Sequence, residues 1–256
     1  MKLEELTGKS MFEVVQELGS FEWTLGDRKV HIKSLLFAEY DYRPNGLPEE
    51  KLANGYGELY YYVELFAVNW REAANLILRP NPLSGLMSKV EVEPGDIFPG
   101  YDMYTGSWYA HIPMIEFDTE ETFSFMPERE LLDMIKRNIT LTTEISSGVL
   151  LQSGPHRNYF FMGLGRLLTE EEMITFIGRA LCMQYRLPNG KDVPLADSVY
   201  LGHALTPMAY VADITRRQYP DLQPSAYNYP ERFLTLRINP KPGYAEPPRV
   251  VDIMRD

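Results

Sequence analysis

Two acidic residues, Glu116 and Asp118, are spaced so that their carboxylates could act together. The segment Met114–Asp118 (MIEFD) is rich in apolar residues and predicts a short strand. Side chains at positions i and i+2 of a strand point to the same face, so we expect both acids to project together from one edge of a sheet. Two like charges this close repel each other, and a divalent cation between them offsets the repulsion. The spacing therefore predicts a site for a hard metal ion.

The same stretch also allows a simpler interpretation. The strand continues into Thr119-Glu120-Glu121, which would form an acidic turn in contact with water. Two acids alone are a weak motif, and Glu120 offers a competing pair with Asp118. On this segment alone, a metal site and a solvated strand end are both open.

The composition predicts a folded globular protein with an acidic surface. The chain has 256 residues, of which 45% are hydrophobic, enough for one large domain or two small ones. Its formal net charge of −11 argues against a broad phosphate-binding surface, because such surfaces are basic. A small site that contacts nucleotides through a metal ion is compatible with this charge.

The absence of targeting signals in this sequence and its cysteine content indicate the expected cellular location. The polar, acidic sequence MKLEELTGKS at the N-terminus lacks signal-peptide character, and no apolar run approaches the ~20 residues of a membrane span. We therefore expect a cytoplasmic protein without a membrane partner. The single cysteine, Cys182, excludes an intramolecular disulfide, and its apolar neighbours predict a buried thiol.

The first hundred residues combine one expected helix with several expected strands. Apolar spacing predicts the helix near the N-terminus, and Gly26-Asp27-Arg28 predicts the turn of a hairpin. Repeated prolines and glycines further on predict a long connection. The helix is expected at 3–18, the strands at 21–25, 29–40, 58–70 and 75–79, and the connection at 83–107.

From residue 110 onward, the pattern is strand, helix, strand, strand, helix, strand. Pro127 starts the first helix, and Thr169 with Glu172 forms a capping box for the second. The strands are expected at 110–118, 146–153, 159–164 and 233–238. This is the order of a split βαβ unit, the RRM-like or ferredoxin-like sheet with both helices on one face. We therefore predict an α+β fold, with an RRM-like core at 110–256 that ends in a proline-rich tail, and an added N-terminal α/β portion at 1–109.

Such a fold would bring distant polar residues to the strand that carries Glu116 and Asp118. His156 lies at the turn of the expected hairpin beside that strand. Asp197 and His203 come shortly before the last expected strand and would approach the same end of the sheet. A lone histidine at a turn is more often structural than functional, so the prediction depends on this convergence.

These residues resemble the motifs of the archaeo-eukaryotic primase superfamily, the catalytic domains of DNA primases and primase-polymerases. Met114–Asp118 resembles the strand motif of that family, in which two acids follow a hydrophobic residue. Ser153-Gly-Pro-His156 is similar to its Ser-x-His motif, and the aromatic strand Tyr159–Gly163 follows. Its later motifs are similar to Asp197, to Gly-His-x-Leu at 202–205 and to Leu236-Arg237. The resemblance covers about residues 110–250.

The resemblance implies a metal-dependent nucleotidyltransferase of DNA primase or polymerase type. Glu116 and Asp118, together with Asp197 and with Glu120 as the competing ligand, would hold Mg²⁺ or Mn²⁺. The metal would bind a nucleoside triphosphate and lower the pKa of an attacking 3′-hydroxyl. His156 would contact the phosphates and stabilise developing charge. Further nucleotide contacts would come from Ser153, Arg157, His203 and Arg237. Nucleoside triphosphates and nucleic acid are the implied partners.

Departures from that family keep two other functions open. The first acid is Glu116 where the family usually has Asp, the histidine motif has one extra residue and a proline, and residues 206–232 resemble an insertion. The same acids would also suit a metal-dependent phosphodiesterase or nuclease. A non-catalytic RRM-like module for binding or assembly is the third function, and the acidic charge favours it.

Overall fold

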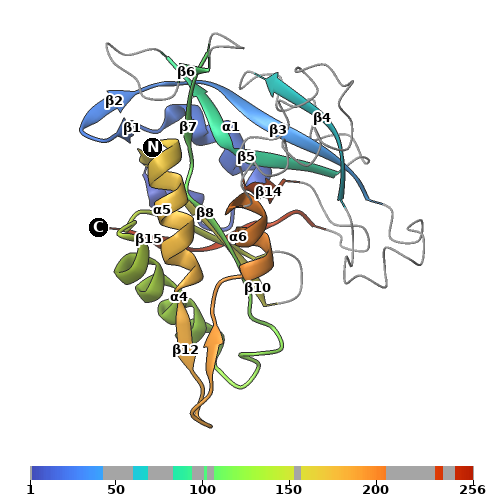
Figure 1. Cartoon of the computed structure of the whole chain (residues 1–256), viewed down its shortest axis with the longest axis vertical. Helices are drawn as coiled ribbons and strands as arrows, with labels where there is room; N and C mark the ends of the chain where they lie inside the picture. Colours follow the sequence, from blue (N-terminus) through green and yellow to red (C-terminus); the bar gives the residue numbers. More distant parts are fainter. Residues whose placement is uncertain are drawn as a thin grey trace, which may run out of the picture.

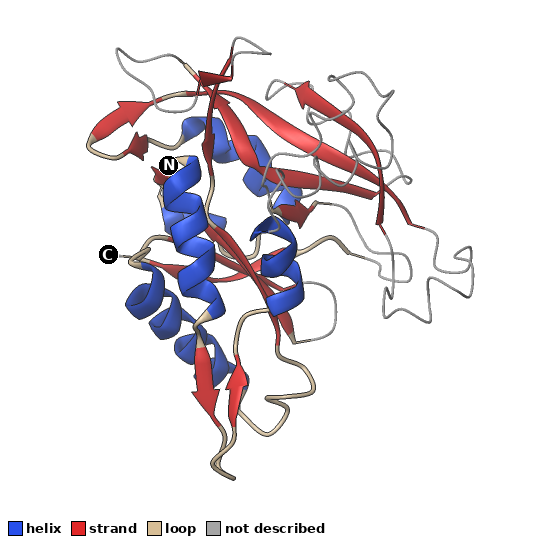
Figure 2. Cartoon of the chain, viewed as in Figure 1, coloured by secondary structure: helices blue, strands red, loops and turns tan. Residues whose placement is uncertain are grey.

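Among the described residues, the two largest β-sheets have six and four strands, and helices pack beside them (Figures 1 and 2). This computed structural model describes residues 2–42, 60–68, 83–93, 101–102, 107–152, 157–205, 234–238 and 246–255. The combination of separate helices with mainly antiparallel sheets confirms the predicted α+β class. Among the described helices, none has the length and apolar character needed to cross a membrane.

The larger sheet has the order β4-β3-β5-β7-β6, with β14 paired to β5, within the described residues. Its long strand β3 pairs with β4 on one side and β5 on the other. The strand expected at 58–70 is confirmed as β4, whereas the strand expected at 75–79 lies outside the described residues. The strands are β3 Ile32–Tyr42, β4 Tyr60–Val68, β5 Leu83–Val92, β6 Tyr101–Asp102, β7 Ser107–His111 and β14 Thr235–Arg237.

The smaller sheet has the order β15-β9-β10-β8, and each neighbouring pair is antiparallel. Strand β10 therefore lies between β8 and β9, which the helix α4 connects. The hydroxyl of Tyr159 donates to Oε1 of Glu128 at 3.0 Å, so α4 covers the face that carries the Tyr159 ring. The elements are β8 Met114–Asp118, α4 Glu128–Thr143, β9 Gly148–Gln152, β10 Asn158–Gly163 and β15 Arg249–Met254.

Local capping signals decide where the helices near both sheets begin. The helix expected at 3–18 is divided, because Gly8 adopts a positive φ of 81° and Ser10 starts a new capping box with Glu13. The result is a 3₁₀ helix at Leu3–Leu6 followed by α1, Met11–Glu17. The predicted hairpin turn is confirmed by the pairing of β1, Trp23–Leu25, with β2, Arg28–Val30.

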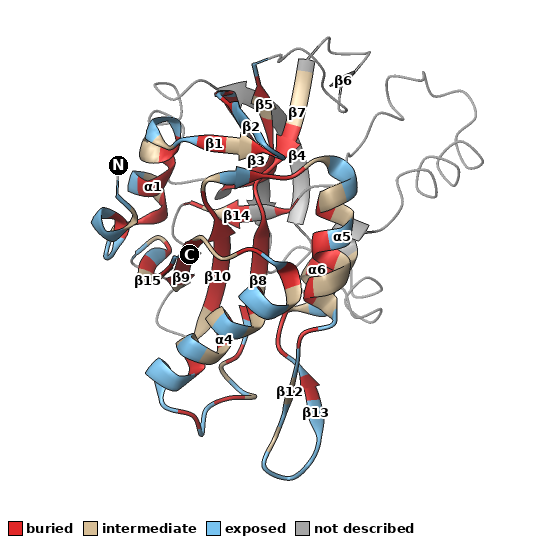
Figure 3. Ribbon diagram, turned by 90° about the vertical axis from the view of Figure 1, so that its left-hand side faces the viewer, coloured by how far each residue is buried: buried red, intermediate tan, exposed pale blue. Residues whose placement is uncertain are grey.

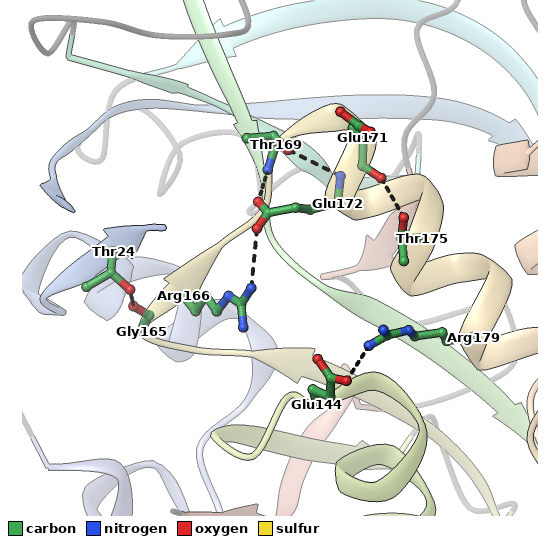
Figure 4. A network of polar contacts seen from close by, with 9 residues as sticks. All are labelled: Thr24, Glu144, Gly165, Arg166, Thr169, Glu171, Glu172, Thr175 and Arg179. Atoms are coloured by element: carbon green, nitrogen blue, oxygen red, sulfur yellow. Dashed lines mark hydrogen bonds and ion pairs between the residues drawn. The ribbon is translucent and has the colours of Figure 1, made fainter. Parts of the chain in front are cut away.

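The predicted capping box of α5, Glu170–Leu181, is confirmed (Figure 4). The Glu172 amide donates to the Thr169 hydroxyl at 3.2 Å, and the Thr169 amide donates to Oε2 of Glu172 at 2.9 Å. Near the other end of α5, Arg179 forms an ion pair with Glu144 at 2.9 Å, just after α4 (Figure 4). The two helices thus lie side by side. After α5 come β12 Gln184–Arg186, β13 Asp192–Pro194 and α6 Ser198–Leu205.

The strand expected at 110–118 is also divided, between β7 of the larger sheet and β8 of the smaller one. Three further expectations about the chain are wrong. Strand β5 occupies part of the connection expected at 83–107; its residues from 85 to 90 are all buried, so no alternation marks it as a strand. The expected strand at 233–238 forms as β14, but it joins the larger sheet, and β15 at the end of the chain joins the smaller one. Cys182 is exposed, because it caps the end of α5 instead of pointing into the core.

The N-terminal residues and the later ones share one hydrophobic core, visible as a buried interior in Figure 3. Main-chain hydrogen bonds join Gly8 N to Val250 O at 2.9 Å and Val250 N to Lys9 O at 2.8 Å. Strand β1 pairs in parallel with β11, Arg166–Leu167. The predicted boundary between 109 and 110 falls inside β7, so the 1–109 and 110–256 parts are continuous at that point.

Candidate functional site

Glu116 and Asp118 lie on β8, as expected. Phe117 between them is buried on the α4 side, directly opposite Tyr159 of β10. Glu116 is half-buried opposite Phe160, and Asp118 is exposed at the strand end opposite Asn158. Both acids therefore project from the face of the sheet that is opposite α4.

Asp197 comes from a distant part of the chain to the same strand. Its main-chain N–H donates to the carbonyl of Glu116 at 2.8 Å. Its Oδ1 accepts from the amide of Tyr200 at 3.1 Å, so Asp197 caps the start of α6. The Tyr200 ring meets Phe160 edge-on with 6.3 Å between ring centroids, which places α6 over the face that carries Glu116 and Asp118.

Burial and the acids near this end of the sheet raise the pKa of Asp118. Partial burial raises the pKa of Asp118 above its ordinary value of 3.8, and the negative charges of Asp197, Glu121 and Glu120 raise it further, in that order. Asp197 is therefore the acid with the strongest effect on Asp118. Glu120, the competing partner expected from the sequence, has the weakest of the three effects. A cation bound here would oppose these repulsions.

The donor chemistry suits a hard cation, but the described residues do not complete a metal cluster. Carboxylate oxygens are the ligands that Mg²⁺ and Mn²⁺ prefer. Within the described part of the chain, no group of three or more His, Cys, Asp or Glu side chains is arranged to hold a metal ion. Ser153 and His156 fall in the segment 153–156, outside the described residues. That segment joins β9 to β10, and β10 begins at Asn158, directly opposite Asp118.

The remaining candidate residues are spread over both sheets. Arg157 donates from Nη2 to the carbonyl of Met126 at 2.7 Å and from Nη1 to the carbonyl of Phe123 at 3.3 Å. Arg237 is half-buried on β14 in the larger sheet, opposite Gly85. His203 belongs to α6, and its side chain lies outside the described part of the chain.

One polar group beside Asp118 has no counterpart in the motifs. Asn158 stands directly opposite Asp118, and side chains of such a pair share one face. Within the described residues, Oδ1 of Asn158 is buried without a hydrogen-bond partner. The cross-strand register, which the sequence does not reveal, is what brings this neutral oxygen next to the acids.

A second polar group lies inside the larger sheet, where Lys89 of β5 pairs with His111 of β7. Both side chains are buried, with exposed fractions of 6% and 5%. The Lys89 ammonium lies 3.5 Å from the centre of the Tyr109 ring. Burial, with the positive charge of Lys89, lowers the pKa of His111 to about 3, so the imidazole is neutral at physiological pH. The sequence does not reveal this pair, because β5, continuously buried from 85 to 90, shows no alternation that would mark it as a strand.

No protein-family model matches this chain, and comparisons with curated proteins and with solved structures found no match.

Proposed function

We propose that this chain is a metal-dependent nucleotidyltransferase of DNA primase or polymerase type, with its site at the end of β8. One observation carries the proposal: Asp197 lies beside the pair Glu116 and Asp118. Its amide is bonded to Glu116, and its charge raises the pKa of Asp118. Glu116 and Asp118 belong to the first motif of the resemblance and Asp197 to a later one. They are far apart in the sequence, and the fold brings them together.

The arrangement of the smaller sheet supports an RRM-like core. Strands β8 and β9 run parallel, α4 connects them, and β10 lies between them, as in a split βαβ unit. The difference is at the sheet edges, since β15 extends the sheet beyond β9 and the chain around Asp197 runs beside β8.

In this proposal, Asp118 and Asp197 are the main ligands of Mg²⁺ or Mn²⁺, with Glu116 beside them. The bound cation would supply charge neutralisation for the triphosphate and a lower pKa for the attacking 3′-hydroxyl. His156 would contact the phosphates from the β9–β10 connection. The half-buried setting of Glu116 would exclude part of the surrounding water and so strengthen these interactions.

A labelled primer–template incubated with Mn²⁺ and nucleoside triphosphates tests the proposal directly. We expect extension of the primer that requires both the metal and the triphosphates. Shortening of the oligonucleotide without triphosphates would instead identify a metal-dependent nuclease or phosphodiesterase. Neither extension nor shortening, together with a melting temperature unchanged by Mn²⁺ plus triphosphate, would exclude both activities, since a ligand of the native state must stabilise it.

The second candidate function is a non-catalytic RRM-like module for binding or assembly. Two of the candidate residues have structural contacts that favour it. Asp197 caps α6, and Arg157 donates to two main-chain carbonyls. This alternative predicts that Asp197 and Arg157 serve only these structural contacts. A melting temperature that Mn²⁺ does not change would support it.

A further inference from the structure

Arg157 lies directly before β10, and its side chain is on the other face of the sheet from Asp118. Asn158 shares a face with Asp118, so the residues on either side of it, Arg157 and Tyr159, face α4. Burial and the hydrogen bond to Glu128 raise the pKa of the Tyr159 hydroxyl to about 12, although the positive charge of Arg157 partly opposes this rise. Arg157 and Tyr159 therefore lie close to each other on the α4 side.

The contacts of Arg157 all lead to the turn that joins β8 to α4. Its guanidinium donates to the carbonyls of Phe123 and Met126, at 3.3 Å and 2.7 Å. Its own carbonyl accepts from the hydroxyl of Thr119, the residue directly after Asp118. Thr119 and Phe123 are fully buried, and the Phe123 amide donates to the Thr119 carbonyl at 2.9 Å.

These contacts fix the main chain at Thr119, Phe123 and Met126. The turn that they hold follows directly after Asp118 and carries Glu120 and Glu121. Phe123 anchors the turn against Tyr185, with 5.4 Å between ring centroids. By donating to two carbonyls of this turn, the Arg157 side chain also restrains the end of β8, which the turn follows.

We propose that Arg157 is a positioning residue, which holds the turn after β8 so that the Asp118 carboxylate faces Asp197, and that it does not contact the nucleotide. This inference rests on the proposed function, because it assigns the role to the same metal site. It replaces the phosphate contact that the primase resemblance implies for this arginine. If Arg157 holds the main chain, its substitution should weaken Mn²⁺ binding. If it contacts a phosphate, its substitution should weaken triphosphate binding.

The test compares Arg157→Met and Arg157→Lys with Arg129→Met, which removes an exposed arginine from the first turn of α4. Two dissociation constants are measured: Mn²⁺ alone, and a nucleoside triphosphate at saturating Mn²⁺. We expect Arg157→Met to weaken Mn²⁺ binding about tenfold or more, as loss of an outer-shell contact does. The lysine variant should recover part of this loss, because one ammonium reaches one carbonyl. Triphosphate binding should change by less than about twofold.

Thr119→Val keeps the test open if Arg157→Met does not fold. It removes only the hydroxyl that donates to the Arg157 carbonyl, and we expect a smaller loss of Mn²⁺ affinity in the same direction. Weaker triphosphate binding with unchanged Mn²⁺ affinity would overturn the inference and restore the phosphate contact. Unchanged Mn²⁺ affinity in all variants would also overturn it. Absence of Mn²⁺ binding by the unmodified protein would refute the proposed function itself, and the inference with it.

Discussion

Two regions of the molecule bring ionisable side chains together, and they differ in how deeply those side chains are buried. Between β5 and β7, Lys89 and His111 are almost completely buried, and the imidazole is held neutral with a pKa of about 3. At the end of β8, Asp118 is exposed and close to other acids, and its pKa is raised. In the interior, the His111 imidazole is neutral. At the end of β8, the Asp118 carboxylate remains in contact with solvent.

The difference separates a structural polar pair from a candidate ligand site. An isolated charge in the interior costs so much that the group gives up or takes up a proton. A partly exposed carboxylate beside other carboxylates carries a smaller cost, which a cation from solution can remove. A raised pKa alone does not identify function, but at this exposed strand end a bound cation would relieve the repulsion that acts on Asp118.

The largest expected effect is that of Asp118→Asn. We expect it to lower primer extension about 100-fold or more, because it removes a charge that would hold the metal. The same variant should be more stable than the unmodified protein at neutral pH without metal. The folded pKa of Asp118 lies above 3.8, so its contribution to stability falls as pH rises through the interval between these values. Activity assays and thermal unfolding with and without Mn²⁺ measure both.

Asp27→Asn is the matched control, since Asp27 is exposed in the hairpin turn between β1 and β2. It should leave activity and the Mn²⁺ effect unchanged. If Asp118→Asn retained normal activity, the ligand interpretation of the β8 end would be wrong.

The next effect concerns acid unfolding and His111. Its folded pKa of about 3 lies below the ordinary 6.5, so the unfolded state binds the extra proton. His111 therefore lowers stability as pH falls from 6.5 toward 3, by up to about 1.4 kcal/mol per pH unit. His111→Leu should flatten this part of the curve of unfolding free energy against pH. An equal slope in both proteins, or an equal effect of His31→Leu at an exposed position, would contradict the assignment.

A smaller effect separates the two roles of Asp197. Asp197→Ala removes the cap of α6 and should cost about 1 kcal/mol of unfolding free energy. Asp197→Asn keeps an oxygen for the Tyr200 amide but removes the charge, so stability should be retained while Mn²⁺ binding weakens. Chemical denaturation measures the unfolding free energy of both variants, and Mn²⁺ titration measures their metal affinity. Together the two measurements separate the capping role from the metal-binding role. Equal Mn²⁺ affinity in Asp197→Asn and the unmodified protein would leave Asp197 with only its structural role.

The smallest effect is expected for Glu120→Gln. Glu120 is the weakest of the three charges that raise the pKa of Asp118, so Mn²⁺ affinity should change by less than about twofold. Isothermal titration compares it with Asp197→Asn. A larger loss in Glu120→Gln would show that the competing pair Asp118 and Glu120 forms the site.

The sequence by itself determined the features whose physical cause lies within a few residues. The capping box of Thr169 and Glu172 and the turn at Gly26-Asp27-Arg28 satisfy main-chain groups locally, and both are confirmed. The alternation of Met114–Asp118 likewise placed Glu116 and Asp118 on one strand. The α+β class follows from the sum of such local preferences.

The tertiary structure alone decided what depends on pairing between distant strands. It put β14 beside β5, set Asn158 opposite Asp118, brought Asp197 to Glu116 and buried Lys89 against His111. Strand order and register depend on how the whole core is buried from water, and the sequence of one strand does not identify its partner strand. The pKa of Asp118 depends on both, because Glu120 and Glu121 follow it in the sequence, whereas its burial and its approach to Asp197 come from the fold. The first acids were therefore visible in the sequence, but the burial and the distant acid beside them were not.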